Sequence, residues 1–158
     1  MKIFSWSDSF PVFIATFGPV GYLPIAPGTW GSGAAILIWW FAMRPLPVLY
    51  YLIILLLLTA VAVWSSSQAE KTLGHDSGHI VIDEVVGQLI ALVICPRSIL
   101  FAVSGFFIFR LFDIWKPAPI NSSQNLSSGW GVVMDDLLAG IYTAIVLFII
   151  AYLTSRYA

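Results

Sequence analysis

Long apolar runs, separated by short polar or proline-containing segments, set the pattern of this chain. The run from Val48 to Trp64 carries no charged residue and approaches the roughly 20 residues that cross the hydrocarbon core of a membrane. Another long run extends from Gly131 to Leu153, with two adjacent aspartates near its start and no charge after them. Both runs therefore predict membrane-spanning helices.

Three shorter apolar runs complete the pattern, and each is followed directly by a basic residue and a proline, in either order. These runs cover residues 29–43, 80–95 and 98–115. Proline cannot continue a helix interior, so each run predicts one helix that ends there. The segments 65–79 and 116–130 are rich in polar residues and predict loops. The expected fold is an all-α, polytopic membrane helix bundle with about five transmembrane helices.

The N-terminal segment is less regular than the rest. Residues 10–28 contain several prolines and glycines and are short for a sixth span. We therefore expect a re-entrant or interfacial segment there, with a sixth span as the alternative. The sequence contains no internal repeat and no shift in composition that would mark a second domain. Residues 1–158 are expected to form a single integral membrane domain.

The composition agrees with lipid as the main solvent. Hydrophobic residues make up 59% of the chain and charged residues 9%, against roughly 25% charged residues in a typical soluble protein. The net charge of -1 provides no basic surface for nucleic acid, so we expect no nucleic-acid partner. The single cysteine, Cys95, stands beside a proline, and no arginine follows six residues later, as a cysteine-nucleophile phosphatase requires. That enzyme class is excluded.

Five acidic residues stand out because they lie near the ends of apolar runs. If each of the five runs crosses the membrane once, the loops 65–79 and 116–130 lie at one face, and all five acids lie beside them. These acids are Asp83, Glu84, Asp113, Asp135 and Asp136. A charge at the centre of a membrane helix costs about 2.5–3.5 kcal/mol, so such residues are candidates for function. The alternatives are acids that stabilise a helix dipole, and a structural ion pair between Asp113 and Arg110.

Small residues follow two of these acids at intervals of four. The two stripes are Asp83, Gly87 and Ala91, and Asp136, Gly140 and Ala144. Small residues allow transmembrane helices to approach closely, so both stripes predict helix contacts that turn the acids inward. Inward carboxylates at one depth repel each other unless a cation lies between them, and oxygen ligands of this kind suit Mg²⁺. Asp83, Glu84 and Asp136 are our candidate metal ligands.

Basic and hydroxyl side chains near the acids are candidates for binding a phosphate. Arg110 and Lys116 are the cations nearest the acids in the expected topology. Thr29 and Ser32 lie where the first apolar helix begins at the same face, and the free N–H groups of a helix start attract phosphate. The alternatives are a lysine that extends to the membrane surface and an ordinary capped helix start. A cation transporter or channel is a further alternative, because inward acids also line ion pathways.

Three stretches of the chain carry a resemblance to a known family. They are IAPGTWGSGAA at 25–35, HDSGHIVIDEVVG at 75–87, and FRLFDIWKPAPI at 109–120 with GWGVVMDDLLAGIY at 129–142. In these motifs the chain resembles the bacterial phosphatidylglycerophosphatase A family. The resemblance implies a Mg²⁺-dependent phosphatase of the bacterial inner membrane. Such an enzyme converts phosphatidylglycerophosphate to phosphatidylglycerol and phosphate in phospholipid biosynthesis.

Residue roles follow from the same motifs. The acidic positions of the family pattern fall on the five acids found from the topology, so the resemblance implies that all five are catalytic. His75 and Asp76 are weaker candidates. The family's substrate is an anionic phospholipid that arises in the cytoplasmic leaflet, so the acids are expected to face the cytoplasm. Any of the five could accept a proton from the attacking water.

Overall fold

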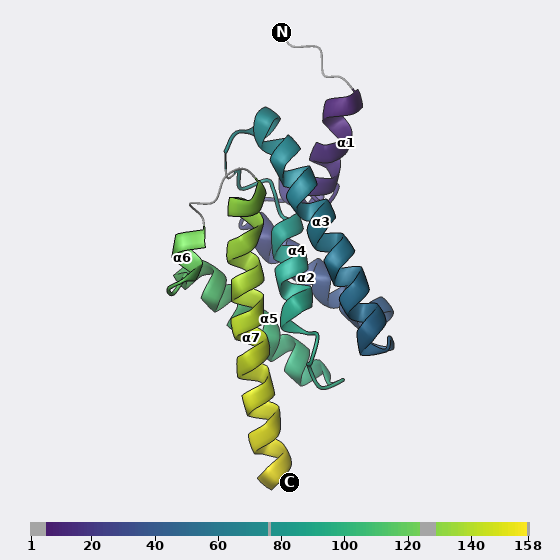
Figure 1. The fold of residues 1–158 in the computed structure, drawn as a ribbon, viewed down its shortest axis with the longest axis vertical. Helices are drawn as coiled ribbons and strands as arrows, with labels where there is room; N and C mark the ends of the chain where they lie inside the picture. Colours follow the sequence, from purple (N-terminus) through teal and green to yellow (C-terminus); the bar gives the residue numbers. More distant parts are fainter. Residues whose placement is uncertain (1–5, 76, 124–128, 158) are drawn as a thin grey trace.

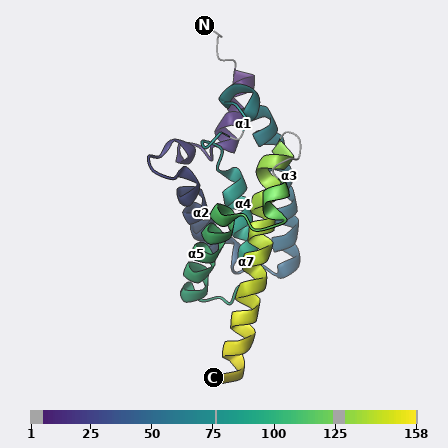
Figure 2. The same ribbon diagram turned by 90° about the vertical axis from the view of Figure 1, so that its left-hand side faces the viewer.

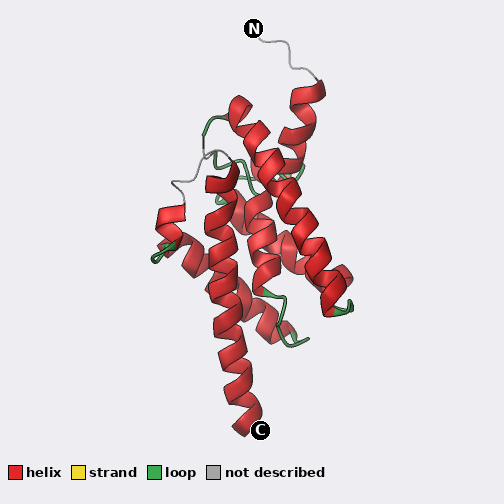
Figure 3. Cartoon of the chain, in the orientation of Figure 1, coloured by secondary structure: helices red, strands yellow, loops and turns green. Residues whose placement is uncertain are grey.

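The computed structural model describes residues 6–75, 77–123 and 129–157, and all regular secondary structure among them is helical (Figures 1 and 3). The elements are α1 (Trp6–Ala15), a 3₁₀ turn (Val20–Tyr22), α2 (Pro27–Ile38) with a π-helical extension (Trp39–Met43), α3 (Val48–Leu73), α4 (Ile82–Ala91), α5 (Ile99–Trp115), α6 (Ile120–Ser123) and α7 (Gly129–Tyr157). The all-α fold class predicted from the apolar runs is confirmed.

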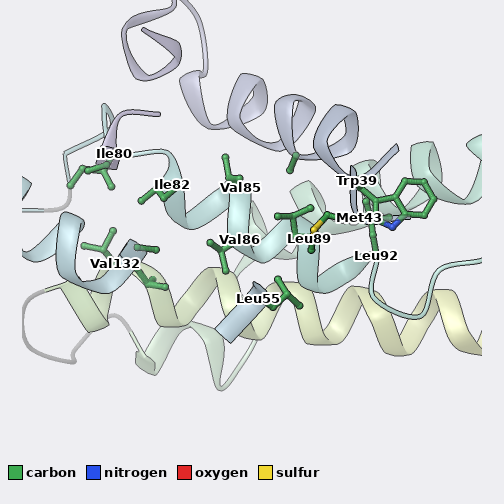
Figure 4. Packing of buried hydrophobic residues seen from close by; sticks show 14 of the residues in the cluster. Trp39, Met43, Leu55, Ile80, Ile82, Val85, Val86, Leu89, Leu92 and Val132 are labelled. Carbon is green, nitrogen blue, oxygen red and sulfur yellow. The ribbon is translucent and has the colours of Figure 1, made fainter. Parts of the chain in front are cut away.

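Helix α4 is short and lies at the centre of the bundle. Eight of its ten residues are buried, and it packs against α2, α3, α5 and α7 (Figures 1 and 2). Figure 4 shows Val85, Val86 and Leu89 of α4 among core side chains from the other helices. At 1.5 Å per residue, α4 spans about 15 Å, half the roughly 30 Å of a hydrocarbon core. Its apolar surroundings are therefore supplied mainly by protein.

Two helices have the length and apolar character to cross a membrane. They are α3, with a mean hydropathy of 2.4, and the segment Gly129–Ser155 of α7, with a mean hydropathy of 2.3. Large apolar side chains on both, such as Leu56 and Phe148, are exposed. This surface agrees with a protein in contact with lipid. Helices α2, α4 and α5 are shorter, so the expectation of about five crossings stays a prediction.

Helix α3 is longer than its apolar run. The prediction of a loop over 65–79 is wrong for residues 65–73, which continue the helix. This polar segment stays helical because its small side chains pack inside the bundle. Ser65, Ser66 and Ala69 are fully buried. Beside them, the hydroxyl of Ser67 accepts a hydrogen bond from the N–H of Gly129 at 3.0 Å, which joins α3 to the start of α7.

The N-terminal segment folds back against the start of α4. Helix α1 contains a proline and packs against α3, so part of the segment 10–28 is helical despite its composition. The N–H of Val81 donates to the carbonyl of Ala15 at 2.9 Å, and Nδ1 of His79 lies 2.8 Å from the carbonyl oxygen of Gly21. These contacts hold the segment before α2 against the segment before α4.

The longer helices after α1 run in alternating directions (Figure 1). Helices α2, α4 and α7 begin at the end of the bundle where α3 and α5 finish. The hydrogen bond from the N–H of Gly129 to the hydroxyl of Ser67 and the contacts between α5 and the starts of α4 and α7 show this arrangement. The C-terminal part of α7 extends beyond the other helices at the opposite end (Figures 1 and 2). The acids therefore gather at one end, as the alternation predicts.

Candidate active site

Three carboxylates from two helices form a compact group near this end of the bundle. Asp83 and Glu84 belong to the first turn of α4, and Asp136 lies near the start of α7. One oxygen atom from each lies within 4.8 Å of the other two, a spacing that allows all three to bind one cation. The alternative of acids that stabilise a helix dipole also has support, because both acids lie in the first turn of α4 and Oδ1 of Asp83 accepts a hydrogen bond from the N–H of Glu84 at 3.1 Å.

Helices α4 and α7 come together at two glycines. A side chain on Gly140 would overlap the carbonyl oxygen of Gly87, and one on Gly87 would lie 2.6 Å from the carbonyl oxygen of Asp136. Backbone therefore contacts backbone where the helices cross, and Ala91 and Ala144 beside the crossing are buried. The predicted helix contact through the two small-residue stripes is confirmed. This contact brings the acids of α4 beside Asp136.

Two of the three carboxylates are buried, that of Glu84 is partly exposed, and the group is short of hydrogen-bond donors. Asp83 and Asp136 are only 6% and 3% exposed. Oε2 of Glu84 and Oδ1 of Asp136 are buried and have no hydrogen-bond partner in the described part of the chain. An unpaired buried carboxylate oxygen is costly, and a divalent cation would coordinate several such oxygens at once. The residues present therefore fit a divalent cation.

Helix α5 adds Arg110 and Asp113 to this end of the bundle. Nη1 of Arg110 lies 2.6 Å from Oδ2 of Asp113, which is the ion pair weighed as an alternative, and 3.8 Å from Oε1 of Glu84. Nε of Arg110 is buried and has no hydrogen-bond partner among the residues that the structure describes. Arg110 therefore connects Asp113 to the three grouped carboxylates and retains a donor for a further acceptor.

Lys116 stands at the end of α5 and faces α7. Its ammonium group donates to Oδ2 of Asp135 at 2.6 Å. Burial favours a lower pKa for Lys116, but the hydrogen bond to Asp135 and the nearby charges of Asp113 and Asp136 outweigh it and raise the pKa. The lysine therefore stays positively charged at neutral pH. Its side chain is 28% exposed, so the cation remains accessible.

The first turn of α2 lies directly against Glu84. Oε1 of Glu84 occupies the space in which a side chain on Gly28 would begin. Thr29 is partly buried, whereas Ser32 is fully buried and donates from its hydroxyl to the carbonyl of Gly28 at 3.0 Å. The helix start expected to attract a phosphate is therefore beside the acids. The motif IAPGTWGSGAA contains Gly28, but its contact with Glu84 has no signal in the sequence.

His75, a weaker candidate, does not belong to this group. His75 is exposed, and its Nδ1 lies 2.5 Å from Oε1 of Glu70 at the end of α3. Asp76 lies outside the described residues. Cys95 follows the far end of α4, away from the acids, which agrees with the exclusion of a cysteine-nucleophile phosphatase.

The fold, its exposed apolar helices and its buried acids define a helical protein of membrane character with a site suited to a divalent cation. The family model for phosphatidylglycerophosphatase A matches residues 13–151. The chain belongs to the phosphatidylglycerophosphatase A family. The resemblance seen in the sequence motifs is thereby confirmed.

Three relatives match over most of their length. Phosphatidylglycerophosphatase A of Escherichia coli (strain K12) is 39% identical over 135 residues, which cover 84% of this chain and 78% of that protein. Its counterpart from Haemophilus influenzae is 38% identical over 135 residues, covering 84% and 83%. A protein of Bacteroides thetaiotaomicron, provisionally described as a phosphatidylinositol-3-phosphatase, is 35% identical over 144 residues, covering 87% and 91%. No solved structure matches this chain.

Proposed function

We propose that this chain hydrolyses phosphatidylglycerophosphate to phosphatidylglycerol and phosphate. The observation that carries this proposal is the similarity to the phosphatidylglycerophosphatases A of Escherichia coli and Haemophilus influenzae, which extends over most of each protein. A cation transporter receives no support from the family. It also requires acids along a path through the bundle, whereas the acids that the structure describes gather at one end.

Asp83, Glu84 and Asp136 are the proposed ligands of Mg²⁺. The unpaired oxygens of Glu84 and Asp136 support this assignment, because hard carboxylate oxygens are the ligands that Mg²⁺ prefers. When bound, the cation would neutralise charge on the phosphoryl oxygens and favour ionisation of a bound water. The protein's own contribution is to hold three carboxylates within reach of one ion and to exclude bulk water from them.

The basic side chains are the proposed binding groups for the substrate's phosphates. Nε of Arg110 has no hydrogen-bond partner among the described residues, so it can donate to a phosphate oxygen. The hydrogen bond to Asp135 keeps Lys116 positively charged, and this charge would attract a phosphate. Thr29 is proposed as a further contact at the start of α2, because the first turn of a helix favours a phosphate. Ser32 has the least support among these residues, because its buried hydroxyl already donates to a carbonyl within α2.

Hydrolysis requires a group that takes a proton from the attacking water. The water oxygen bonds to phosphorus, the bond from phosphorus to the glycerol oxygen breaks, and one proton reaches the leaving oxygen. All five acids remain proposed catalytic residues. Asp113 and Asp135 lie outside the proposed metal set, so one of them is the proposed proton acceptor. Asp113 contacts Arg110 and Asp135 contacts Lys116, and these ion pairs also hold the two acids in position.

We place the enzyme in the bacterial inner membrane as a multi-pass protein, with the acids facing the cytoplasm. The exposed apolar surface of α3 and α7 and the alternating helix directions support this placement. In the proposed topology α2, α3, α4, α5 and α7 each cross once, and the flanking segments complete the shorter helices. The N-terminal segment, including α1, would lie at the interface, since α1 contains a proline and the glycines and prolines of residues 18–28 leave no apolar run to complete a span.

Phosphate release from purified protein in detergent micelles tests the proposed activity. We expect turnover of phosphatidylglycerophosphate with Mg²⁺, and none after EDTA until Mg²⁺ is restored in excess. Phosphatidylinositol 3-phosphate is the necessary comparison substrate, because the Bacteroides thetaiotaomicron relative carries that description. If the protein hydrolysed phosphatidylinositol 3-phosphate faster than phosphatidylglycerophosphate, the inositol lipid would become the proposed substrate. No hydrolysis of any lipid phosphate by folded protein would overturn the enzymatic function.

A further inference from the structure

We propose that Gly28 is a positioning residue of the proposed metal site. Its missing side chain lets the carboxylate of Glu84 lie between the first turn of α2 and Arg110, so that one oxygen is held and the other faces the cation. The inference rests on the proposed metal site, but it concerns a residue that binds neither metal nor substrate through a side chain.

The contact between α2 and Glu84 is unusually close. A Cβ atom built on Gly28 would overlap Oε1 of Glu84, would lie 2.7 Å from its Cδ, and would lie 3.2 Å from Nη1 of Arg110. Oε1 itself is 3.8 Å from the same Nη1. Glycine at position 28 is therefore the condition for Glu84 to occupy this place between α2 and α5.

The two oxygens of Glu84 have different surroundings. Oε1 lies against α2 and near Arg110, whereas Oε2 is buried without a hydrogen-bond partner among the described residues. A buried carboxylate oxygen without a donor is costly unless a cation binds it. We therefore assign Oε2 as the oxygen that Glu84 offers to the ion shared with Asp83 and Asp136. The position of Gly28 decides which oxygen is available.

A methyl group at position 28 should therefore affect the metal site more than the fold. The atom that it would displace is the far end of a flexible side chain, so Glu84 can rotate away without moving the backbone. Alanine also favours a helix over glycine. The rotated carboxylate would leave the group in which the three ligand atoms lie within 4.8 Å.

Binding of Mn²⁺, used as a paramagnetic probe for the Mg²⁺ site, tests this inference. We expect Gly28→Ala to weaken Mn²⁺ binding, measured by electron paramagnetic resonance, by at least about tenfold, as loss of a ligand's support does elsewhere. Gly33→Ala is the matched control on the same helix, because a Cβ atom there meets nothing within 4 Å. It should bind Mn²⁺ as the unmodified protein does. Equal Mn²⁺ affinity in both variants would overturn the inference.

A second pair of variants separates positioning from general damage. Glu84→Ala removes the carboxylate that Gly28 accommodates, so it should weaken Mn²⁺ binding by itself. In the Glu84→Ala background, adding Gly28→Ala should weaken Mn²⁺ binding no further. If Gly28→Ala alone misfolds, the double variant should fold, because Glu84→Ala removes the carboxylate that the added methyl group would overlap. A further loss in the double variant would show a role independent of Glu84 and overturn the inference. Because no lipid is needed, these results stand apart from the test of the proposed substrate.

Discussion

At the scale of single residues, the site concentrates negative charge that the protein alone does not balance. Asp136 is close enough to each of the other four acids to be repelled by them. The basic side chains that reach these acids in the described structure are Arg110 and Lys116. Repulsion between like charges in a buried group lowers the free energy of unfolding, and a bound divalent cation reduces this repulsion. The acids should therefore reduce stability in the absence of metal.

Asp136→Asn tests this balance. Asparagine has nearly the same shape but no charge, so without metal the variant should melt at the same temperature as the unmodified protein or higher. Mg²⁺ should raise the melting temperature of the unmodified protein and leave that of the variant unchanged. Phosphate release should fall by about 100-fold or more, because charge stabilisation in the site is lost. A variant that keeps both its stabilisation by Mg²⁺ and its turnover would contradict the role of Asp136.

The five acids can be predicted from the sequence because a charge inside an apolar run is costly and therefore rare. Their partners cannot be predicted in the same way. The contact of Lys116 with Asp135 joins residues from two different helices, and the contact of Arg110 with Glu84 does the same. The distances between side chains on different helices depend on how the helices are rotated and tilted relative to one another. The spacing of residues within one apolar run does not predict these rotations and tilts.

At the scale of helices, the crossing of α4 and α7 brings together the ligands of the proposed metal site. The two helices carry different members of the proposed ligand set, and neither Gly87 nor Gly140 places a side chain between the two backbones at the crossing. Unlike the end of a glutamate side chain, the backbone carbonyl of Gly87 cannot rotate away from a new side chain on Gly140. Any added atom must therefore separate the helices.

Gly140→Ala should separate the ligands of the proposed site. We expect a loss of about 1–3 kcal/mol in unfolding free energy from overpacking, against the gain that alanine normally brings to a helix. Binding of Mn²⁺ should weaken as well, because Asp136 moves away from the acids of α4. Gly33→Ala again serves as the control, since it adds a methyl group in open space. Unchanged stability and Mn²⁺ affinity would show that the crossing does not define the site.

Sequence patterns predict these helices unevenly, for a physical reason. The stripes through Gly87 and Gly140 predict the crossing correctly, because close helix contact requires small residues. The extension of α3 over 65–73 is not predicted, since its support is a tertiary contact with the start of α7. Hydropathy also cannot distinguish a helix that faces lipid from a helix that is surrounded by protein. Helix α4 is surrounded by protein, since eight of its ten residues are buried.

At the scale of the whole molecule, the access of a lipid substrate to the acids depends on which helices cross the membrane. Helices α3 and α7 alone have the expected length among the described residues. In a five-crossing topology the N-terminus lies on the side of the acids, opposite the C-terminus. If only α3 and α7 cross, residues 1–47 lie on the side of the C-terminus, away from the acids. That topology would separate the start of α2 from α4, although Gly28 lies against Glu84 in the structure. The location of the N-terminus therefore tests the packing of α2 as well as the number of crossings.

Fusions to green fluorescent protein and to alkaline phosphatase can locate three positions. We expect the N-terminus and an insertion after Gly74 to lie in the cytoplasm, and a fusion after Ala158 to lie outside, because five crossings place the two termini on opposite sides. Gly74 is a suitable insertion point, since it follows α3 and nothing lies near its Cβ position. An N-terminal reporter outside, with the Gly74 insertion still inside, would leave only α3 and α7 as crossings. That result would contradict the contact of Ala15 with Val81 and of Gly28 with Glu84, and the proposed site would then lack the first turn of α2.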